Sequence, residues 1–134
     1  MNIIYKETKE FNPTDLQDLF LSVEWSSGHY PEKLAIAMQN SQTVYTAWSE
    51  GKLVGLINVL DDSIMTAYIN YLLINPEFQG KGIGKHLINS VKNKYKDYLR
   101  IVLIAYDKET AFYQHLGFET GDEKVPMFIT SLWT

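Results

Sequence analysis

Apolar and polar positions along the chain follow two periods, which together predict a mixed α/β order. After Asn12 as a cap, Leu16, Leu19 and Phe20 recur at helical spacing. Runs rich in β-branched and aromatic residues predict strands, and Glu50-Gly51-Lys52 between two such runs is a hairpin signal. The expected helices cover residues 13–22, a segment after Pro31, a segment from Gly82 onward and residues 108–116. The expected strands cover residues 3–6, 43–49, 53–60, 65–74, 100–105 (apolar and buried) and 125–133 (a strand or a hairpin).

The expected elements follow the order β-α-α-β-β-β-α-β-α-β, which is typical of a mixed sheet flanked by helices. A chain of 134 residues fits one domain, residues 1–134, with a real core. No linker, repeat or low-complexity stretch interrupts it. The fold class expected from the pattern is therefore single-domain α/β.

Composition narrows the classes of function. No apolar run approaches the roughly 20 residues of a membrane span, and the N-terminus lacks a signal-peptide core, so we expect a cytoplasmic chain with no membrane partner. The absence of cysteine excludes disulfides and thiolate catalysis, and three scattered histidines predict no metal site. The net charge of −4 argues against nucleic acid and suits a cationic amine.

A glycine-rich junction between a strand and a helix carries the chemistry. Gly80, Gly82 and Gly84 stand where an apolar run turns into a helix, so their backbone N–H groups and the helix N-terminus predict an anion site. An ordinary turn before a helix is the alternative. A P-loop is excluded because Gln79 stands five positions before Gly84 and His86 follows Lys85, and no glycine completes the dinucleotide pattern G-x-G-x-x-G.

The remaining pattern, Gln79-x-x-Gly82-x-Gly84, resembles motif A of the GCN5-related N-acetyltransferases (GNAT). A second segment, Ala111 to Phe118, resembles that family's A-x-x-F-Y-x-x-x-G-F sequence. The resemblance runs from Thr43 onward and implies a GNAT-like fold with the element order above. It also implies acetyl-coenzyme A as cosubstrate, a small-molecule amine as the second substrate and, as an open option, a homodimer.

The resemblance also assigns roles to residues. Tyr113 would be the general acid toward the leaving thiolate, or else a structural residue that positions the sulfur. An aromatic loop around Trp25 and Tyr30, with Tyr71 on the strand, would bind the acceptor; closing the end of the core is the alternative for the loop. The expected cofactor contacts are the backbone of Leu72, Leu73 and Ile74, together with Gln79, Gly80, Lys81, Gly82, Ile83, Gly84 and Lys85.

Two positions depart from the family's pattern. Tyr71, preceded by Asn70, stands where relatives often place a carboxylate base, and Tyr106-Asp107 stands where they often carry an asparagine that contacts the cofactor. Two hypotheses therefore stand. The first is an N-acetyltransferase that works by direct attack in a ternary complex, and the second is a non-catalytic acetyl-coenzyme A sensor or docking module. The candidates for a replacement base are Glu24, His29, Asp61 and Asp62.

Overall fold

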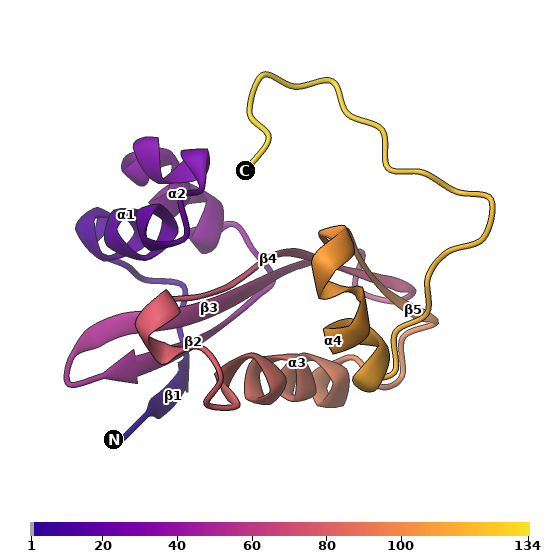
Figure 1. The fold of residues 1–134 in the computed structure, drawn as a ribbon, viewed down its shortest axis with the longest axis horizontal. Helices are drawn as coiled ribbons and strands as arrows, with labels where there is room; N and C mark the ends of the chain where they lie inside the picture. The colour runs from indigo at the N-terminus through magenta and orange to yellow at the C-terminus, as the bar shows by residue number, and fades with distance from the viewer. Residues whose placement is uncertain (1) are drawn as a thin grey trace.

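One five-stranded sheet with helices on both faces forms the centre of the protein in a computed structural model that describes residues 2–134 (Figure 1). The strands follow the order β1-β2-β3-β4-β5, and all neighbours are antiparallel except β4 and β5, which are parallel. The strands are β1 (Ile4–Glu7), β2 (Thr43–Ser49), β3 (Lys52–Asp61), β4 (Thr66–Ile74) and β5 (Arg100–Leu103). The helices are α1 (Pro13–Ser22), α2 (Pro31–Gln39), α3 (Ile83–Lys94) and α4 (Thr110–His115), with 3-10 turns η1 (Ser26–His29), η2 (Pro76–Phe78) and η3 (Asp107–Glu109).

The local signals of the sequence are confirmed where they rest on capping and turn chemistry. The Asn12 side chain accepts a hydrogen bond from the Thr14 N–H at 3.0 Å and starts α1 at Pro13. Glu50 and Gly51 both have positive φ, 49° and 80°, which is the geometry of a two-residue type I′ hairpin between β2 and β3.

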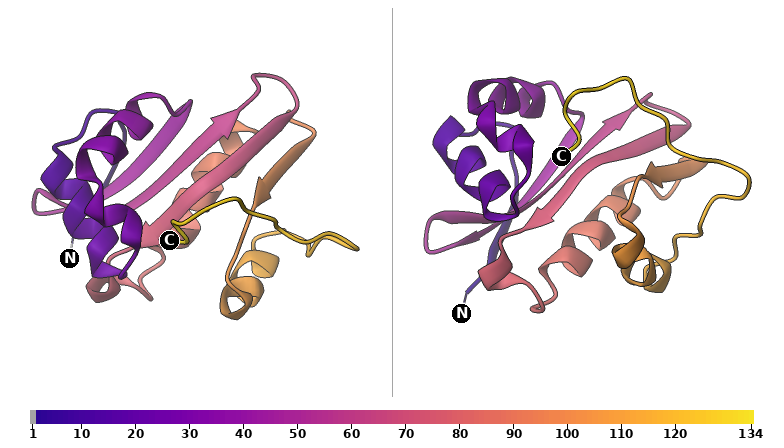
Figure 2. Two further views of the ribbon diagram at one scale, coloured as in Figure 1. Left: turned by 90° about the horizontal axis from the view of Figure 1, so that it is seen from above. Right: turned by 45° about the horizontal axis from the view of Figure 1, so that its top comes forward.

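The helices divide between the two faces of the sheet (Figure 2), and an apolar cluster lies on each side. Helices α1 and α2 cover one face, where Phe20, Met38 and Leu56 belong to a fully buried cluster. Helix α3 covers the other face with Leu87 and Ile88 against β3 and β4. The burial of these large side chains is the main driving force of the fold, at about 1.5–3 kcal/mol for each.

Strand β4 contains a β-bulge at Asn70. Asn58 of β3 pairs with Tyr71, but the next residue, Val59, pairs with Ile69, so Asn70 is an extra residue without a partner. One extra residue reverses the alternation of side chains along a strand. Accordingly, Ile69 packs in the α3 cluster, whereas Tyr71 and Leu73 pack in the α1/α2 cluster.

The buried side chain of Asn58 holds the bulge in place. Its Oδ1 accepts the Tyr71 backbone N–H at 2.9 Å, and its Nδ2 donates to Ser41 Oγ at 3.1 Å. Asn58 is 1% exposed, so water cannot take over either contact. The side chain thus replaces a ladder hydrogen bond that the bulge removes.

Strands β4 and β5 separate just beyond the bulge. Their pairing covers Thr66 to Ile69 on β4 and Arg100 to Leu103 on β5, and ends there. Residues 71–74 of β4 still pair with β3 on one side, but no strand among residues 2–134 pairs with them on the other. The result is an open strand edge that leads directly into the glycine loop.

Two predictions about the C-terminal third are wrong. No strand forms at residues 125–133, because this segment finds no backbone partner within residues 2–134. The strand expected at 100–105 is shorter, Arg100–Leu103, and it is not buried: Val102 is 38% exposed and Ile104, just after it, 49%. Both errors share one cause, since β5 is the sheet edge that a further strand would cover.

The structural role of Asn58 gives a stability prediction. Asn58→Ala removes the acceptor of the Tyr71 N–H and leaves this buried donor unpaired, so we expect the free energy of unfolding to fall by about 1–3 kcal/mol. Urea denaturation measures it. Asn89→Ala, on the exposed face of α3, is the matched control and should stay within about 0.5 kcal/mol of the parent. Equal losses in the two variants would show that Asn58 does not support the bulge.

Candidate functional site

The glycine loop requires its glycines for conformation more than for space. Gly80 and Gly82 have φ of 77° and 84°, and a Cβ built on either would meet no atom within 4 Å. Only the left-handed backbone demands glycine there. Gly84 differs, because its Cβ would lie 3.3 Å from the ring of Phe112 in α4, which packs directly on the start of α3. The conformation of the loop is therefore set by the left-handed backbone of Gly80 and Gly82 and by the packing of α4 on Gly84.

Six consecutive N–H groups of this loop are left without a partner. Across residues 2–134, the backbone N–H groups of residues 80–85 donate no hydrogen bond to the protein; His86, bonded to the Gly82 carbonyl at 3.0 Å, is the first that does. The Gln79 side chain points back instead and donates to the Ile74 carbonyl at 3.0 Å. Lys81 and Lys85 are exposed and form no ion pair in the described part of the chain. Such a row of donors at the N-terminus of a 12-residue helix suits a pyrophosphate.

The open edge of β4 is a second stretch with free backbone groups. Leu72, Leu73 and Ile74 lie in this part of β4, with their side chains in the two apolar clusters. The contact of their backbone with an extended amide-bearing arm stays a prediction. The adjacent Asn75 ends the strand, since its N–H donates to the Val54 carbonyl at 2.8 Å and its side chain caps η2.

Tyr113 lies on α4 and packs against the α3 cluster. Its ring makes edge-to-face contacts with Phe112 and Phe118, at centroid distances of 5.0 and 5.7 Å. The α4 helix ends at His115 and is followed by Gly117, with φ of 98°; Lys92 of α3 donates to the Leu116 carbonyl at 2.7 Å. No hydrogen bond to the Tyr113 hydroxyl occurs among the described residues, so it is free to meet a ligand.

Burial, assisted by the negative charge of Glu109, raises the pKa of Tyr113 to about 12. The phenol is therefore protonated throughout the neutral and mildly basic range. An ordinary thiol has a pKa of about 8.5, so a proton moving from Tyr113 to a thiolate climbs about 3.5 units, or roughly 5 kcal/mol. A buried thiolate also has a raised pKa, which narrows this gap.

Aromatic side chains form the wall on the α1/α2 side. The Tyr71 ring lies 4.9 Å from Phe20 and 6.0 Å from Trp25, and Trp25 lies 6.5 Å from Tyr106, which follows β5. The bulge is what turns Tyr71 toward this wall. Tyr106 also belongs to this aromatic wall, but the sequence analysis did not name it as an acceptor residue. Its position just after the strand expected at residues 100–105 was the available signal.

A groove of about 320 Å³ lies beside this wall. Tyr30 and Tyr71 both line it, and the Tyr71 hydroxyl lies 2.8 Å from Ser27 Oγ. Trp25 touches Tyr71 from behind and does not line the groove itself. Lys33 is the one charged residue in the lining, so the groove does not share the net negative charge of the whole chain. The full lining consists of Ser27, Tyr30, Lys33, Leu34, Ala37, Tyr71 and Leu132.

The candidate bases lie elsewhere or have other roles. Asp61 faces Ala67 on β4, four residues and about 13 Å of strand from Tyr71, and it accepts hydrogen bonds from the Tyr95 and Tyr98 hydroxyls. Asp62 is fully exposed, and the N–H groups of the following turn lower its carboxyl pKa. Glu24 and His29 are exposed.

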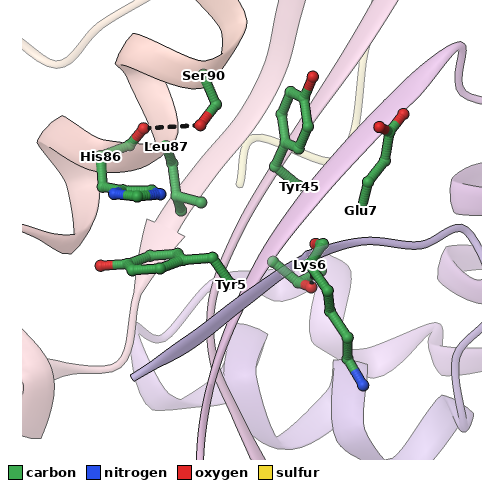
Figure 3. A pocket seen from close by; sticks show the side chains of 8 residues that line it. Tyr5, Lys6, Glu7, Tyr45, His86, Leu87 and Ser90 are labelled. Atoms are coloured by element: carbon green, nitrogen blue, oxygen red, sulfur yellow. Dashed lines mark hydrogen bonds between the residues drawn. The ribbon is translucent and has the colours of Figure 1, made fainter. Parts of the chain in front are cut away.

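A second groove, of about 230 Å³, lies between β1, β2 and α3 (Figure 3). There the Tyr5 ring stacks on His86 with centroids 3.5 Å apart, which makes His86 a packing residue. The lining of this groove contains neither the glycine loop nor Tyr113. No three histidine, aspartate or glutamate side chains come together as metal ligands within residues 2–134.

Comparison with known proteins gives a consistent result. A family model described as "Acetyltransferase (GNAT) domain" matches residues 8–127. The chain is 32% identical to GCN5-related N-acetyltransferase 2, chloroplastic, of Arabidopsis thaliana, over 92% of this chain and 56% of that protein. It is 31% identical to an uncharacterized N-acetyltransferase, ycf52, of Gracilaria tenuistipitata var. liui, over 93% and 71%. The chain thus spans from about half to about 70% of these relatives.

Solved structures show the same fold. A GNAT family acetyltransferase from Streptococcus pneumoniae TIGR4 superimposes with a TM-score of 0.83 at 26% identity, covering 97% of this chain and 99% of that one. Glucosamine-6-phosphate N-acetyltransferase from Arabidopsis thaliana superimposes with a TM-score of 0.72 at 13% identity, covering 95% and 99%. In the described part of this chain, no helix has the length and apolar character needed to cross a bilayer. The cytoplasmic location stays a prediction, and the first relative is named as chloroplastic.

The left-handed backbone of the loop gives a binding prediction. Gly82→Val places a β-branched side chain at φ of 84°, which distorts the row of N–H groups, and we expect coenzyme A affinity to fall at least about tenfold in calorimetry. Gly51→Val is the matched control, because Gly51 has φ of 80° and equally open space but lies in the β2–β3 hairpin. It should bind coenzyme A like the parent. Unchanged binding in Gly82→Val would remove the loop from the cofactor site.

Proposed function

Since the chain belongs to the GNAT acetyltransferase family, we propose that it moves an acetyl group from acetyl-coenzyme A to a primary amine by direct attack in a ternary complex. The observation that carries the proposal is the presence of two free backbone stretches close together in the sequence, the open edge of β4 and the N–H groups of residues 80–85. Together they fit a cosubstrate that ends in a pyrophosphate and continues as an amide-bearing arm. The shorter phosphate sites of nucleotide-binding loops have no need of the strand edge.

In the proposed reaction, the neutral amine nitrogen forms a bond to the thioester carbonyl carbon, and the bond from that carbon to sulfur breaks. The amine gives up a proton, and the leaving thiolate receives one. A backbone N–H on the β4 edge would stabilise the oxyanion formed on attack. The chain contains no cysteine to carry an acetyl group, which favours direct transfer over a covalent acetyl-enzyme.

The acceptor is proposed to be a small primary amine with an apolar or aromatic body. It would enter through the groove beside Tyr30 and Tyr71, with Trp25 supporting Tyr71 from behind. An alkylamine with a pKa near 10.4 is about 3.4 units from neutrality at pH 7, which costs roughly 4.6 kcal/mol. Lys33 disfavours the ammonium form in the groove, and no lining carboxylate removes the proton, so the proton is proposed to leave to water.

A non-catalytic sensor of acetyl-coenzyme A is the second candidate, favoured by the lack of a carboxylate in the groove. The two candidates are separated by a screen of primary amines for release of free coenzyme A, with the purified chain and with acetyl-coenzyme A alone as the blank. Amine-dependent release supports the enzyme. Binding of acetyl-coenzyme A without release across aliphatic, aromatic and peptide amines would support the sensor.

The general-acid role of Tyr113 predicts a turnover effect. Tyr113→Phe keeps the ring contacts with Phe112 and Phe118 but removes the proton donor, so we expect the single-turnover rate to fall by about 10²- to 10⁴-fold with coenzyme A affinity unchanged. Tyr68→Phe, a partly buried tyrosine of β4 in the part paired with β5, is the matched control and should keep the parent rate. A Tyr113→Phe enzyme at full rate would make Tyr113 structural.

The protonation states predict a pH profile with one rising limb. Below the amine pKa, kcat/KM should rise about tenfold per pH unit as the neutral amine becomes available. Tyr113 donates only while protonated, and with its pKa near 12 it stays protonated up to pH 10, so we expect no descending limb in that range. Initial rates from about pH 4 to about pH 10 measure this. An inflection near pH 5 would reveal a carboxylate base, and a fall below pH 9 that Tyr113→Phe removes would contradict the raised pKa.

A further inference from the structure

The C-terminal arm, residues 119–133, has no regular secondary structure, yet it exposes many large apolar side chains. Ile129 is as exposed as in a free peptide, at 108%, and Met127 is 88% exposed. No backbone hydrogen bond from residues 119–133 to another segment occurs within residues 2–134. An apolar surface of this kind on a folded chain indicates an unfilled interaction. Its apolar members are Val125, Met127, Phe128, Ile129, Leu132 and Trp133.

Both ends of the arm are fixed to the protein. At its start, the Phe118 N–H donates to the Tyr113 carbonyl at 3.1 Å, and Phe118 packs on the α3 cluster. At its end, the Thr134 carbonyl accepts hydrogen bonds from the Ser27 N–H at 2.8 Å and from Ser27 Oγ at 2.7 Å, and Ser26 adds further contacts. Between these anchors the arm loops away from the body, as Figure 1 shows.

The sequence of the arm is that of a strand buried on both faces. From Val125 to Trp133 the residues are Val-Pro-Met-Phe-Ile-Thr-Ser-Leu-Trp, apolar on both alternating sets and without a charge. The single proline, Pro126, stands at the beginning, where a strand tolerates the missing N–H. Such a segment is stable only when another strand pairs with it and both faces are covered.

The surface that lacks this strand is the free edge of β5. It is the end of the sheet, and its neighbour β4 occupies only one side. Val102 and Ile104 are exposed there, as expected for residues from which a covering strand is missing. An uncovered strand edge with apolar side chains is a site for strand addition.

The positions of the two anchors indicate whether the arm pairs with β5 of its own chain or with β5 of a second molecule. The arm begins at the end of α4, which packs on the α3 face through Phe112, and ends at η1 on the α1/α2 face, so it passes around the β5 edge instead of running along it. Pairing with its own β5 would require Thr134 to leave Ser26 and Ser27. The outward middle of the arm can reach the β5 edge of another molecule with both anchors intact.

We propose that residues 125–133 of one copy add as a strand to the β5 edge of a second copy, and that the exchange is reciprocal in a two-fold homodimer. The exchange also bears on the groove beside Tyr71, because Leu132 lines this groove and Thr134 is bonded to Ser27. Ordering the arm in a dimer holds that wall in place.

Sedimentation velocity of the full chain over a wide range of concentrations tests the proposal. We expect a species of twice the 15.5 kDa chain mass that dissociates on dilution. Adjacent N–H groups of a strand point to opposite edges, so either Phe128→Pro or Ile129→Pro removes an N–H that faces β5. At least one of the two should raise the dissociation constant at least about tenfold.

Ile129→Asp and Ile36→Asp form a matched pair. Both residues are exposed in the single chain, at 108% and 58%, so neither substitution should unfold it. Ile129→Asp should dissociate the dimer at least about tenfold more readily, while Ile36→Asp, on the solvent side of α2, should leave it intact. Hydrogen exchange should show protection of residues 100–103 and 125–133 that grows with the dimer population.

Three outcomes would overturn the proposal. The first is a chain that stays monomeric at every concentration. The second is a dimer that persists unchanged in Phe128→Pro, Ile129→Pro and Ile129→Asp, which would place the interface elsewhere. The third is protection of residues 125–133 that is already complete in the dilute monomer, which would mean that the arm closes on its own β5.

Discussion

The extra residue in β4, Asn70, is the constraint on which the arrangement of the site depends. An unbroken strand would point Tyr71 to the same face as Ile69, toward α3, and would keep β4 in register with β5. The bulge instead sends Tyr71 to the aromatic wall, and β4 runs free of β5 from that point to the glycine loop. Asn58 stabilises the bulge, because its side chain accepts a hydrogen bond from the Tyr71 N–H, which has lost its partner in the strand ladder.

The two halves of the site are therefore consequences of one irregularity. In the proposed function, an extended cosubstrate would pair with the open edge of β4, and the reversed side-chain alternation would place Tyr71 in the wall that contacts the acceptor. Gly84 and Phe112 add the remaining fixed point, because Phe112 packs on the start of α3 and the Tyr113 ring contacts Phe112, which places Tyr113 near the glycine loop. A change at Asn58 would disturb both halves, whereas a change at Gly82 would disturb the anion site alone.

Local chemistry was readable from the sequence, and non-local pairing was not. Asn12 with Pro13, the Glu50-Gly51 hairpin and the glycines before α3 each act within a few residues, so their patterns predicted α1, the β2–β3 turn and the glycine loop that starts α3. Asn58 looks like an ordinary polar residue in a strand, because its role depends on a residue 13 positions away. The predictions of a buried β5 and of a strand at 125–133 were wrong for the same reason. An apolar run indicates that a segment needs a partner, but it does not identify the segment that pairs with it.

The proton balance follows from the same groove. A carboxylate beside the acceptor would hold an ammonium ion as well as accept its proton, and such a charge buried against Phe20 and Trp25 would be costly without a partner. Tyr71 occupies that position instead, with its hydroxyl satisfied by Ser27 Oγ at 2.8 Å. In the proposed function, the groove would select the neutral amine by the cost of desolvating the charged one, and Tyr113, with its pKa near 12, would keep its proton until a more basic group forms beside it. In the proposed reaction that group is the buried thiolate, so the same exclusion of water that disfavours the ammonium ion also makes the final proton transfer less uphill.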